Sequence, residues 1–273
     1  IAPPGEARPS PPPPEAHPLV KELWESLQSL SPKNFQEVYH DAFADKETLQ
    51  TLYDLGLVSL RDRALAEEIF YHIARRVQAI AQNLPYVPDE LEDLEKLLAD
   101  KLVCNFSVFQ SLPDAWAIHQ LFPVVPLSRL LEPPTRRATL VDISCDSDGK
   151  MDRFIDLHDV RQTLPVHPVR PGEPYYLGVF LVGAYQDVLG SNHNLFGQVG
   201  EAHVRVEEEG FAIERFVGGE TAERVIEKMG FTARELMLGV ERLVRRSRLS
   251  PAEKGAFLER YARELQGYTY LED

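Results

Sequence analysis

The chain has 273 residues, enough for one large domain or two ordinary ones with a buried core. Its formal net charge of −14 argues against nucleic acid as a partner, because phosphates select basic surfaces. The sequence has no apolar run near the roughly 20 residues that cross a bilayer, so we expect no membrane contact. Cys104 and Cys145 are the only cysteines, which argues against a disulfide framework and predicts a reducing, cytoplasmic location.

The first 18 residues are rich in proline and include Pro11-Pro12-Pro13-Pro14. Such a composition favours extended polyproline geometry and cannot build a core. We therefore expect residues 1–18 to be a linker, with a ligand for a proline-reading domain as the alternative. Because a linker joins two parts, we also expect a further domain upstream.

Apolar residues spaced three and four apart predict a helical domain over residues 19–101. One helix follows Ser59, a residue type that caps helix N-termini. Its expected buried stripe consists of Leu65, Ile69, Ile73, Val77 and Ile80. We find no catalytic cluster in this region.

Residues 102–218 change to short segments rich in β-branched and aromatic residues, separated by Pro, Gly and Asp. Strands are expected over residues 102–109, 139–145, 175–184, 202–207 and 211–217. Glu208-Glu209-Gly210 predicts a hairpin between the last two. Because helices do not alternate with these strands, an antiparallel, barrel-like β domain is expected.

Residues 219–273 return to a helical pattern. Thr232 and Ser250 each begin a capping-box sequence, and Pro251 suits the first turn of the second helix. The expected inner faces are Leu236, Val240 and Leu243 on the first helix, and Phe257, Leu258, Tyr261 and Leu265 on the second. The aromatic tail over residues 267–273 is expected to dock.

The pentapeptide Cys145-Asp146-Ser147-Asp148-Gly149 follows a predicted strand. A strand end holds reactive groups rigidly, while the loop beyond it lets them face a ligand. A thiol can move protons or attack, and carboxylates can hold a cation. A plain acidic turn with a buried, inert thiol is the alternative. We expect no zinc site, because Cys104, His119, Cys145 and His193 share no tight ligand spacing.

Two further segments are candidates for a binding site. Tyr185 follows Gly183-Ala184 after an apolar strand, where its hydroxyl can reach an anion; a core tyrosine is the alternative. The run Ser191-Asn192-His193-Asn194-Leu195-Phe196-Gly197 is by itself typical of a loop.

These segments occur together in an order that resembles the C-terminal part of biosynthetic arginine decarboxylase. The motifs are NFSVFQSLPDAW (105–116), QLFP (120–123), DISCDSDG (142–149), VGAYQ (182–186), HNLFG (193–197) and GYTYLED (267–273). The resemblance covers roughly residues 57–273, and the family contains pyridoxal-phosphate enzymes related to alanine racemase and ornithine decarboxylase. It implies an α+β chain with a helical insertion (19–101), a β domain (102–218) and a C-terminal helical bundle (219–273), lacking the family's N-terminal α/β barrel.

In that family the cofactor, pyridoxal phosphate, is held on a lysine of the barrel. No lysine of this sequence lies in a comparable setting. The resemblance therefore implies the back part of an enzyme, inactive alone, whose partner is the barrel domain that carries the lysine. It also implies a head-to-tail homodimer or a higher homo-oligomer.

The resemblance assigns roles to four residues. Cys145 is implied as the catalytic thiol that shields or protonates the carbon losing carbon dioxide, and Asp146 and Asp148 as guanidinium ligands. Tyr185 is implied as a ligand of the cofactor phosphate. Magnesium is implied by the family alone, without assigned ligands. One departure is Phe106, which stands where ornithine decarboxylases carry an amine-binding aspartate, and this fits a different distal group.

The leading hypothesis is the C-terminal portion of an arginine decarboxylase that converts arginine to agmatine and carbon dioxide in polyamine biosynthesis. A related decarboxylase acting on another basic amino acid is the second hypothesis. The third is a noncatalytic interaction or regulatory fragment that pairs with an intact barrel subunit.

Overall fold

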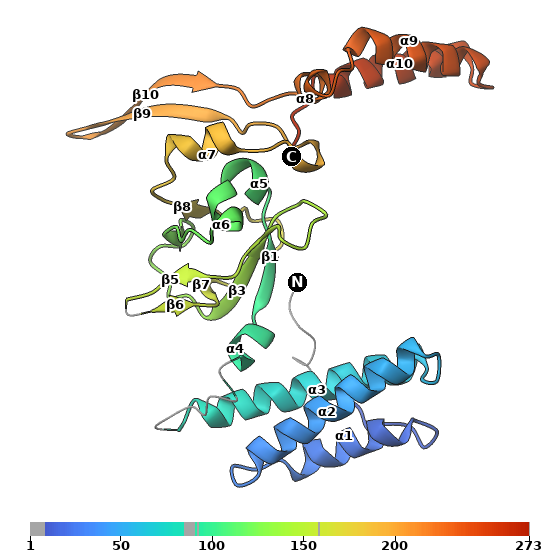
Figure 1. The fold of residues 1–273 in the computed structure, drawn as a ribbon, viewed down its shortest axis with the longest axis vertical. Coiled ribbons are helices and arrows are strands. Elements are labelled where there is room, and N and C mark those ends of the chain that lie inside the picture. The colour runs from blue at the N-terminus through green and yellow to red at the C-terminus, as the bar shows by residue number, and fades with distance from the viewer. Residues whose placement is uncertain (1–8, 85–90, 92, 158, 273) are drawn as a thin grey trace. The chain divides into compact units, whose positions relative to one another are not determined.

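The computed structural model describes residues 9–84, 91, 93–157 and 159–272 (Figure 1). Packing divides the chain into two compact units, which are treated separately below. The first comprises Ile1–Leu102, Pro126–Thr139 and Val160–Leu177, and the second comprises Val103–Val125, Leu140–Asp159 and Gly178–Asp273. The division at residues 18, 101 and 218 stays a prediction. Within the described residues, no helix is long and apolar enough to cross a membrane.

Three long helices form the bundle of the first unit: α1 (Pro18–Ser29), α2 (Phe35–Asp54) and α3 (Leu60–Ala81), followed by the short α4 (Leu94–Leu97). Ser59 caps α3 as predicted, because its Oγ accepts a hydrogen bond from the Asp62 backbone N–H at 3.0 Å. The predicted α3 stripe is confirmed at its centre, where Ile69, Ile73 and Val77 are fully buried.

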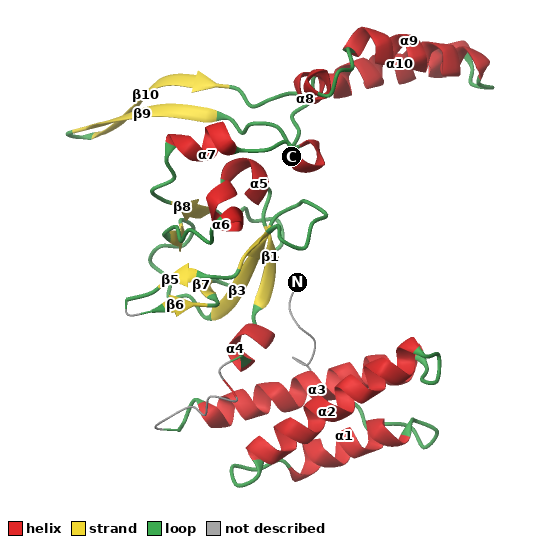
Figure 2. Cartoon of the chain, in the orientation of Figure 1, coloured by secondary structure: helices red, strands yellow, loops and turns green. Residues whose placement is uncertain are grey.

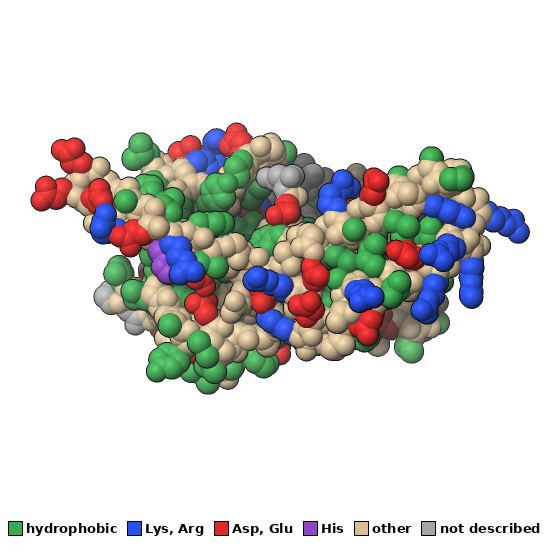
Figure 3. All heavy atoms as spheres, turned by 90° about the horizontal axis from the view of Figure 1, so that it is seen from above, with side chains coloured by type: hydrophobic (Ala, Val, Ile, Leu, Met, Phe, Trp, Pro, Cys, Tyr) green, Lys and Arg blue, Asp and Glu red, His purple; other side chains and the backbone are tan. Residues whose placement is uncertain are grey.

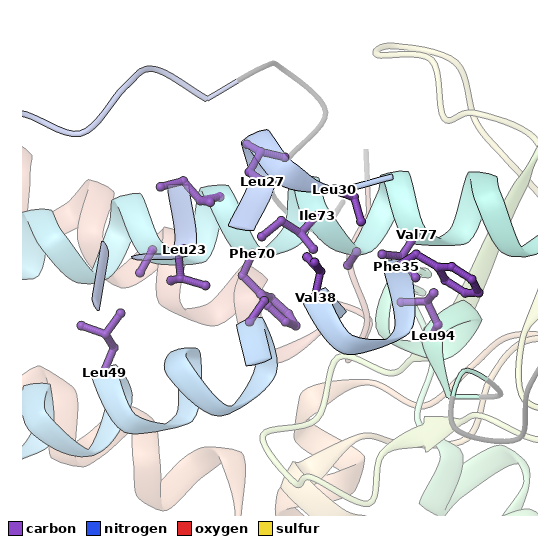
Figure 4. Packing of buried hydrophobic residues seen from close by; sticks show 14 of the residues in the cluster. Leu23, Leu27, Leu30, Phe35, Val38, Leu49, Phe70, Ile73, Val77 and Leu94 are labelled. Atoms are coloured by element: carbon purple, nitrogen blue, oxygen red, sulfur yellow. The ribbon is translucent and has the colours of Figure 1, made fainter. Parts of the chain in front are cut away.

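The core of the bundle is continuous across all three helices (Figure 4). Phe70 of α3 is fully buried, and the rings of Tyr39 and Phe43 on α2 each lie 6.2 Å from its ring centroid. Burying one such side chain contributes about 1.5–3 kcal/mol. The most deeply buried members are Val20, Leu23, Ala42, Leu49, Ile69, Phe70, Ile73, Ala74 and Val77.

Strands are short, and they lie between the helical regions of the sequence (Figure 2). They are β1 (Asp100–Val103), β2 (Val124–Pro126), β3 (Arg136–Val141), β4 (Lys150–Met151), β5 (Phe154–Ile155), β6 (Val160–Arg161), β7 (Leu164–Val166), β8 (Leu177–Val179), β9 (Glu201–Glu207) and β10 (Gly210–Val217). The largest sheet has the order β1-β3-β4 with β7 paired to β3, and β2–β8, β5–β6 and β9–β10 form two-stranded sheets. Pairing is antiparallel for β3–β4, β3–β7 and β9–β10. Over the described residues these sheets do not close, so the barrel-like detail of the expected fold is wrong while its α+β class is confirmed.

The predicted hairpin is confirmed, since Glu207 pairs with Gly210 across the turn between β9 and β10. Two predicted strands are wrong over part of their length. Residues 104–109 leave the strand conformation and enter α5 (Val108–Ser111), because the Ser107 hydroxyl accepts the Gln110 backbone N–H and starts a helix. The helix α6 (Pro113–Ala117) follows directly.

The second error concerns the predicted strand over residues 175–184. Only Leu177–Val179 form β8, and the chain then enters α7 (Ala184–Leu189), with Gly183 at its N-cap. A short 3₁₀ turn, η2 (His193–Leu195), follows. The apolar composition of residues 177–182 therefore indicated a longer strand than the one that forms.

The C-terminal helices are α8 (Ala222–Lys228), α9 (Ala233–Arg246) and α10 (Pro251–Leu265). Both predicted capping boxes are confirmed, at Thr232 and at Ser250. The predicted inner face of α9 is wrong at Leu243, which is exposed, whereas its neighbour Val244 is buried. Figure 3 shows Lys and Arg side chains gathered at its right, the side on which Figure 1 draws α9 and α10.

The aromatic tail docks as predicted. The Tyr270 hydroxyl donates a hydrogen bond to the Gly197 carbonyl at 2.9 Å, and its ring stacks on Phe196 at 5.1 Å. Leu271 exchanges two hydrogen bonds with the Asn105 side chain, at 2.8 and 3.0 Å. These contacts join the tail to the residues that surround the candidate site.

Candidate functional site

The pentapeptide lies on the connection between β3 and β4, which we call the 142–149 loop. Val141 and Lys150 pair across the base of this loop, so it begins and ends on the same sheet. The predicted strand over residues 139–145 therefore ends earlier, at Val141. Residues 145–148 are exposed, whereas Asp142 and Gly149 at the base are buried. The loop thus presents its tip to the outside from a fixed base.

Asp142 fixes the base of the loop. Its Oδ1 accepts hydrogen bonds from the Ser144 backbone N–H at 2.8 Å and from the Ser144 hydroxyl at 2.6 Å. Its Oδ2 accepts the Val108 backbone N–H at 2.8 Å, which ties the loop to the first residue of α5. Because hydrogen bonds to a charged group contribute about 1.5–3 kcal/mol, this carboxylate is a strong local anchor.

Gly149 closes the loop against the same carboxylate. Its carbonyl accepts the Asp142 backbone N–H at 2.8 Å, and its own N–H donates to the Asp146 carbonyl at 3.1 Å. A β-carbon at this position would stand 2.2 Å from Asp142 Oδ1, well inside van der Waals contact. Glycine is therefore needed here for close approach of the backbone.

Asp146 lies at the tip of the loop with its side chain 37% exposed. Its Oδ1 accepts the Asp148 backbone N–H at 2.9 Å, which folds the tip into a tight turn. Its Oδ2 lies 3.6 Å from His193 Nε2, and the His193 ring packs against Phe109 with 4.5 Å between ring centroids. The Asp148 N–H thus orients the carboxylate, while part of the carboxylate still faces outward.

Asp148 has different surroundings from Asp146. It lines a cavity of about 160 Å³ beside the loop, which Asp146 does not line. The walls of the cavity are Ala115, Trp116, His119, Gln120, Leu121, Asp148, Lys150, Met151, Asp152 and Arg153.

Cys145 is exposed, so the alternative of a buried, inert thiol is wrong. Its backbone N–H donates to Asn194 Oδ1 at 3.1 Å, and Asn194 Nδ2 donates to its Sγ at 3.2 Å. Cys104 differs, because burial raises the pKa of its thiol to about 11. Of the two thiols, Cys145 is the one placed for chemistry.

Tyr185 lies in the first turn of α7 with 78% of its surface exposed, so the alternative of a core tyrosine is wrong. The next residue, Gln186, is buried and clamps α7 to α6. Its Nε2 donates to Asp114 Oδ2 at 2.6 Å, and its Oε1 accepts the Asp114 backbone N–H at 3.1 Å. The Tyr185 hydroxyl is therefore held on a fixed helix and faces outward.

The described residues suit the implied cofactor better than the implied metal. Among them, no group of three or more His, Cys, Asp or Glu side chains is placed to hold a metal ion. An exposed thiol, carboxylate and phenol fit the outer parts of a cofactor and substrate brought by another segment. Lys150, the lysine next to the loop, lies 3.9 Å from Asp152.

Sequence reasoning gave no supporting role to four residues that support the site: Asp142, Gly149, His193 and Asn194. Asp142 and Gly149 frame the pentapeptide, and an aspartate and a glycine at the two ends of a short acidic loop are signals of a tight turn. Asn194 lies 49 residues from Cys145, and the sequence gives no sign of that contact or of the contact between His193 and Asp146.

Two family models match separate parts of the chain. The arginine decarboxylase helical bundle domain matches residues 13–95, and the arginine decarboxylase C-terminal helical extension matches residues 222–271. The first match corresponds to the bundle of α1 to α4, and the second to α8 to α10 with the docked tail. The expected helical domain is thus confirmed as the family's helical bundle, while its place as an insertion between two domains stays a prediction.

Similar proteins and one solved structure extend the match to most of the chain. The biosynthetic arginine decarboxylase of Deinococcus radiodurans is 55% identical over 94% of this chain and 40% of its own length, and that of a Nostoc species is 45% identical over 96% and 39%. The crystal structure of the biosynthetic arginine decarboxylase from Campylobacter jejuni is similar with a TM-score of 0.79 at 32% identity, covering 96% of this chain and 42% of that one. The chain therefore belongs to the biosynthetic arginine decarboxylase family and spans about 40% of the length of the relatives it matches.

Proposed function

We propose that this chain is the part of a pyridoxal-phosphate-dependent arginine decarboxylase that supplies the 142–149 loop to an active site completed by another segment. The reaction would convert arginine to agmatine and carbon dioxide, as a step of polyamine biosynthesis. The observation that carries the proposal is the exposed pair Cys145 and Asp146 on a loop whose base is fixed by Asp142. A thiol and a carboxylate held this way suit a substrate that has a reacting carbon at one end and a cation at the other.

Cys145 would act at the reacting carbon. When arginine loses its carboxylate as carbon dioxide, a C–C bond breaks and the same carbon must gain a proton. The Cys145 Sγ can hold that proton and deliver it, a general-acid role, and its exposure allows the substrate to reach it. Pyridoxal phosphate, when bound, supplies the electron sink for this chemistry.

Asp146 would bind the distal guanidinium. A carboxylate accepts paired, charge-assisted hydrogen bonds from this planar group, which favours arginine over a shorter amine. Asp146 Oδ2 faces His193 and Oδ1 accepts the Asp148 backbone N–H, so the carboxylate is already oriented before a substrate arrives. Asp148 would serve as a second guanidinium ligand from the side of the neighbouring cavity.

Tyr185 would donate its hydroxyl to the phosphate of the cofactor. Its position at the start of α7 and its exposure support this role, because an outward-facing phenol can meet a group held by another segment. The partners in this proposal are the barrel domain with the cofactor lysine and a second copy of the subunit, in a homodimer or a higher homo-oligomer.

A chimera tests this proposal. This chain would replace the matching region of the Deinococcus radiodurans enzyme, and release of carbon dioxide and amine products would be measured with arginine, ornithine and lysine. We expect agmatine from arginine and little product from the other two. A folded, cofactor-loaded chimera that acts only on ornithine or lysine would reject arginine as the substrate. A folded chimera inactive on all three would favour a noncatalytic role.

A further inference from the structure

Two consecutive residues of η2 contact two consecutive residues of the 142–149 loop. His193 Nε2 lies 3.6 Å from Asp146 Oδ2, and the Asn194 side chain contacts Cys145 twice. All four residues belong to the second unit. Contacts between segments 49 residues apart in the sequence show that η2 is built against the loop.

The two contacts of Asn194 come from opposite ends of one planar amide. Oδ1 accepts the Cys145 backbone N–H at 3.1 Å, and Nδ2 donates to Sγ at 3.2 Å. The orientation of the amide is determined by chemistry, because a backbone N–H can only donate and so requires the oxygen. The nitrogen must then face the sulfur. One side chain thus fixes both the peptide and the thiol of Cys145.

The backbone that carries Asn194 adopts an uncommon conformation. Asn194 has φ 55° and Leu195 has φ 62°, so two successive non-glycine residues lie in the left-handed region. Such residues cost about 1–3 kcal/mol each and persist only when their surroundings fix them, although asparagine tolerates the region best. Two hydrogen bonds help to fix the turn here: Asn192 Nδ2 donates to the Phe196 carbonyl, and the Leu195 N–H donates to the Asn192 carbonyl, both at 2.8 Å.

We propose that Asn194 is a positioning residue for Cys145, which holds the loop through the peptide N–H and offers its amide N–H to the sulfur. The strained turn is retained because it aims this amide at the thiol. Only the relevance of this role to decarboxylation rests on the proposed function. The placement of the thiol is a property of this chain.

Two substitutions separate the hydrogen bond that Asn194 accepts from the Cys145 N–H from the one that it donates to the sulfur. Asn194→Asp keeps an oxygen for the Cys145 N–H and tolerates the backbone, but it places a carboxylate against the sulfur. Asn194→Gly suits φ 55° and removes both hydrogen bonds without adding strain. Ser191→Asp is the matched control, because it adds the same charge three positions away at an exposed residue outside the hydrogen bonds that fix the turn.

The measurements are the rate of Cys145 alkylation by iodoacetamide at pH 8 and the exchange rate of the Cys145 amide by NMR. Asn194→Asp should slow alkylation about tenfold, the effect of a like charge about 3 Å from a thiolate in water, and leave amide exchange unchanged. Asn194→Gly should speed amide exchange severalfold. Ser191→Asp should alter neither rate.

Alkylation of Asn194→Asp at the wild-type rate would overturn the proposal, as would an equal slowing in Ser191→Asp. Unchanged exchange of the Cys145 amide in Asn194→Gly would overturn the claim that Asn194 holds the Cys145 peptide N–H. These readouts need no decarboxylation, so failure of the proposed function and failure of this inference are distinguishable. An inactive chimera combined with the expected alkylation rates would reject the proposed function and leave the role of Asn194 intact.

Discussion

Gly149 and Asp142 lie in contact at the base of the 142–149 loop, with no space between them for a side chain. A β-carbon on Gly149 would stand 2.2 Å from Asp142 Oδ1 and 2.5 Å from Ser144 Oγ. The Asp142 carboxylate cannot retreat without losing the hydrogen bonds it accepts from Ser144 and Val108. The loop conformation therefore depends on this glycine.

Gly149→Ala should destabilise the second unit by about 1–3 kcal/mol, the usual cost of overpacking a fixed site. Denaturant unfolding followed by near-ultraviolet circular dichroism would measure the change. Gly239→Ala in α9 is the control, because no atom lies within 4 Å of the added carbon, and it should stabilise by about 0.5–1 kcal/mol. Equal stability of the two variants would contradict the close contact between Gly149 and the Asp142 carboxylate.

Tyr270→Phe should lower stability by about 1 kcal/mol, because it leaves the Gly197 carbonyl without the hydroxyl that donates to it in a buried setting. Burial raises the pKa of this phenol, and nearby Tyr268 adds to the effect. Tyr185→Phe is the matched control, since the Tyr185 hydroxyl is exposed and its loss should not change stability. A free energy of unfolding unchanged by Tyr270→Phe would show that this hydroxyl does not stabilise the docked tail.

Lowering the pH should reduce the free energy of unfolding of the second unit, because Glu220 becomes protonated. Burial raises the pKa of this carboxyl, but hydrogen bonds from Lys228 and the Gln198 backbone outweigh it, and the net pKa is lowered. A carboxyl with a lowered folded pKa stabilises the fold above its unfolded pKa of about 4.3, and this contribution is lost as pH falls through the folded value. Unfolding free energies between pH 6 and pH 3 should therefore fall.

Lys228→Met should make this acid dependence shallower, because Lys228 Nζ lies 2.7 Å from the Glu220 carboxylate. Its cost at pH 7 should be about 1–2 kcal/mol. Arg260→Met is the control, since the Arg260–Glu264 pair is exposed and should contribute little. An acid dependence that Lys228→Met leaves unchanged would exclude this pair as its source.

Iodoacetamide at pH 8 should label one cysteine of the folded chain. Cys145 is exposed and reacts, whereas burial raises the pKa of Cys104 to about 11 and keeps it protonated. Peptide mass spectrometry would locate the label, and Cys145→Ser should abolish it. The unfolded chain should take up two labels, which provides the control. Equal labelling of both cysteines in the folded chain would contradict the burial of Cys104.

Short-range signals in the sequence predicted the helix ends and the hairpin correctly. Ser59, Thr232 and Ser250 bond residues three positions ahead, so each cap depends only on its own segment. The strand prediction over residues 102–109 was wrong because the cap at Ser107 outweighed the β propensity of its apolar neighbours. Local composition alone does not decide between a strand and a capped helix in this segment.

The support of the candidate site was beyond reach because it consists of long-range contacts. Asp142 bonds Val108 over 34 residues, and Asn194 bonds Cys145 over 49. Asn105 bonds Leu271 over 166 residues. Such pairs depend on how the whole unit packs, which residue spacing does not reveal. Cys145 and Asp146 could be singled out from their own residue types, whereas their long-range contacts with His193 and Asn194 could not.

In the chimera, substitutions at Cys145 and at Asp146 should impair different steps of the reaction. Cys145→Ala should lower the decarboxylation rate more than it lowers cofactor binding, because the thiol acts at the reacting carbon. Asp146→Ala should mainly weaken arginine binding, by about 2–5 kcal/mol if the pair with the guanidinium is buried. Steady-state kinetics with a cofactor titration would separate the two effects. Unchanged arginine affinity in Asp146→Ala would reject its role as a guanidinium ligand.

The central claim is that the 142–149 loop completes an active site whose remainder lies on another segment. The most direct test measures agmatine formation by the purified chain alone, and by the chain mixed with the remaining portion of the Deinococcus radiodurans enzyme. The account predicts no product from the chain alone, product from the mixture, and a large loss of that product with Cys145→Ala. Agmatine and carbon dioxide released by the chain alone, or a mixture whose rate ignores Cys145→Ala, would contradict it.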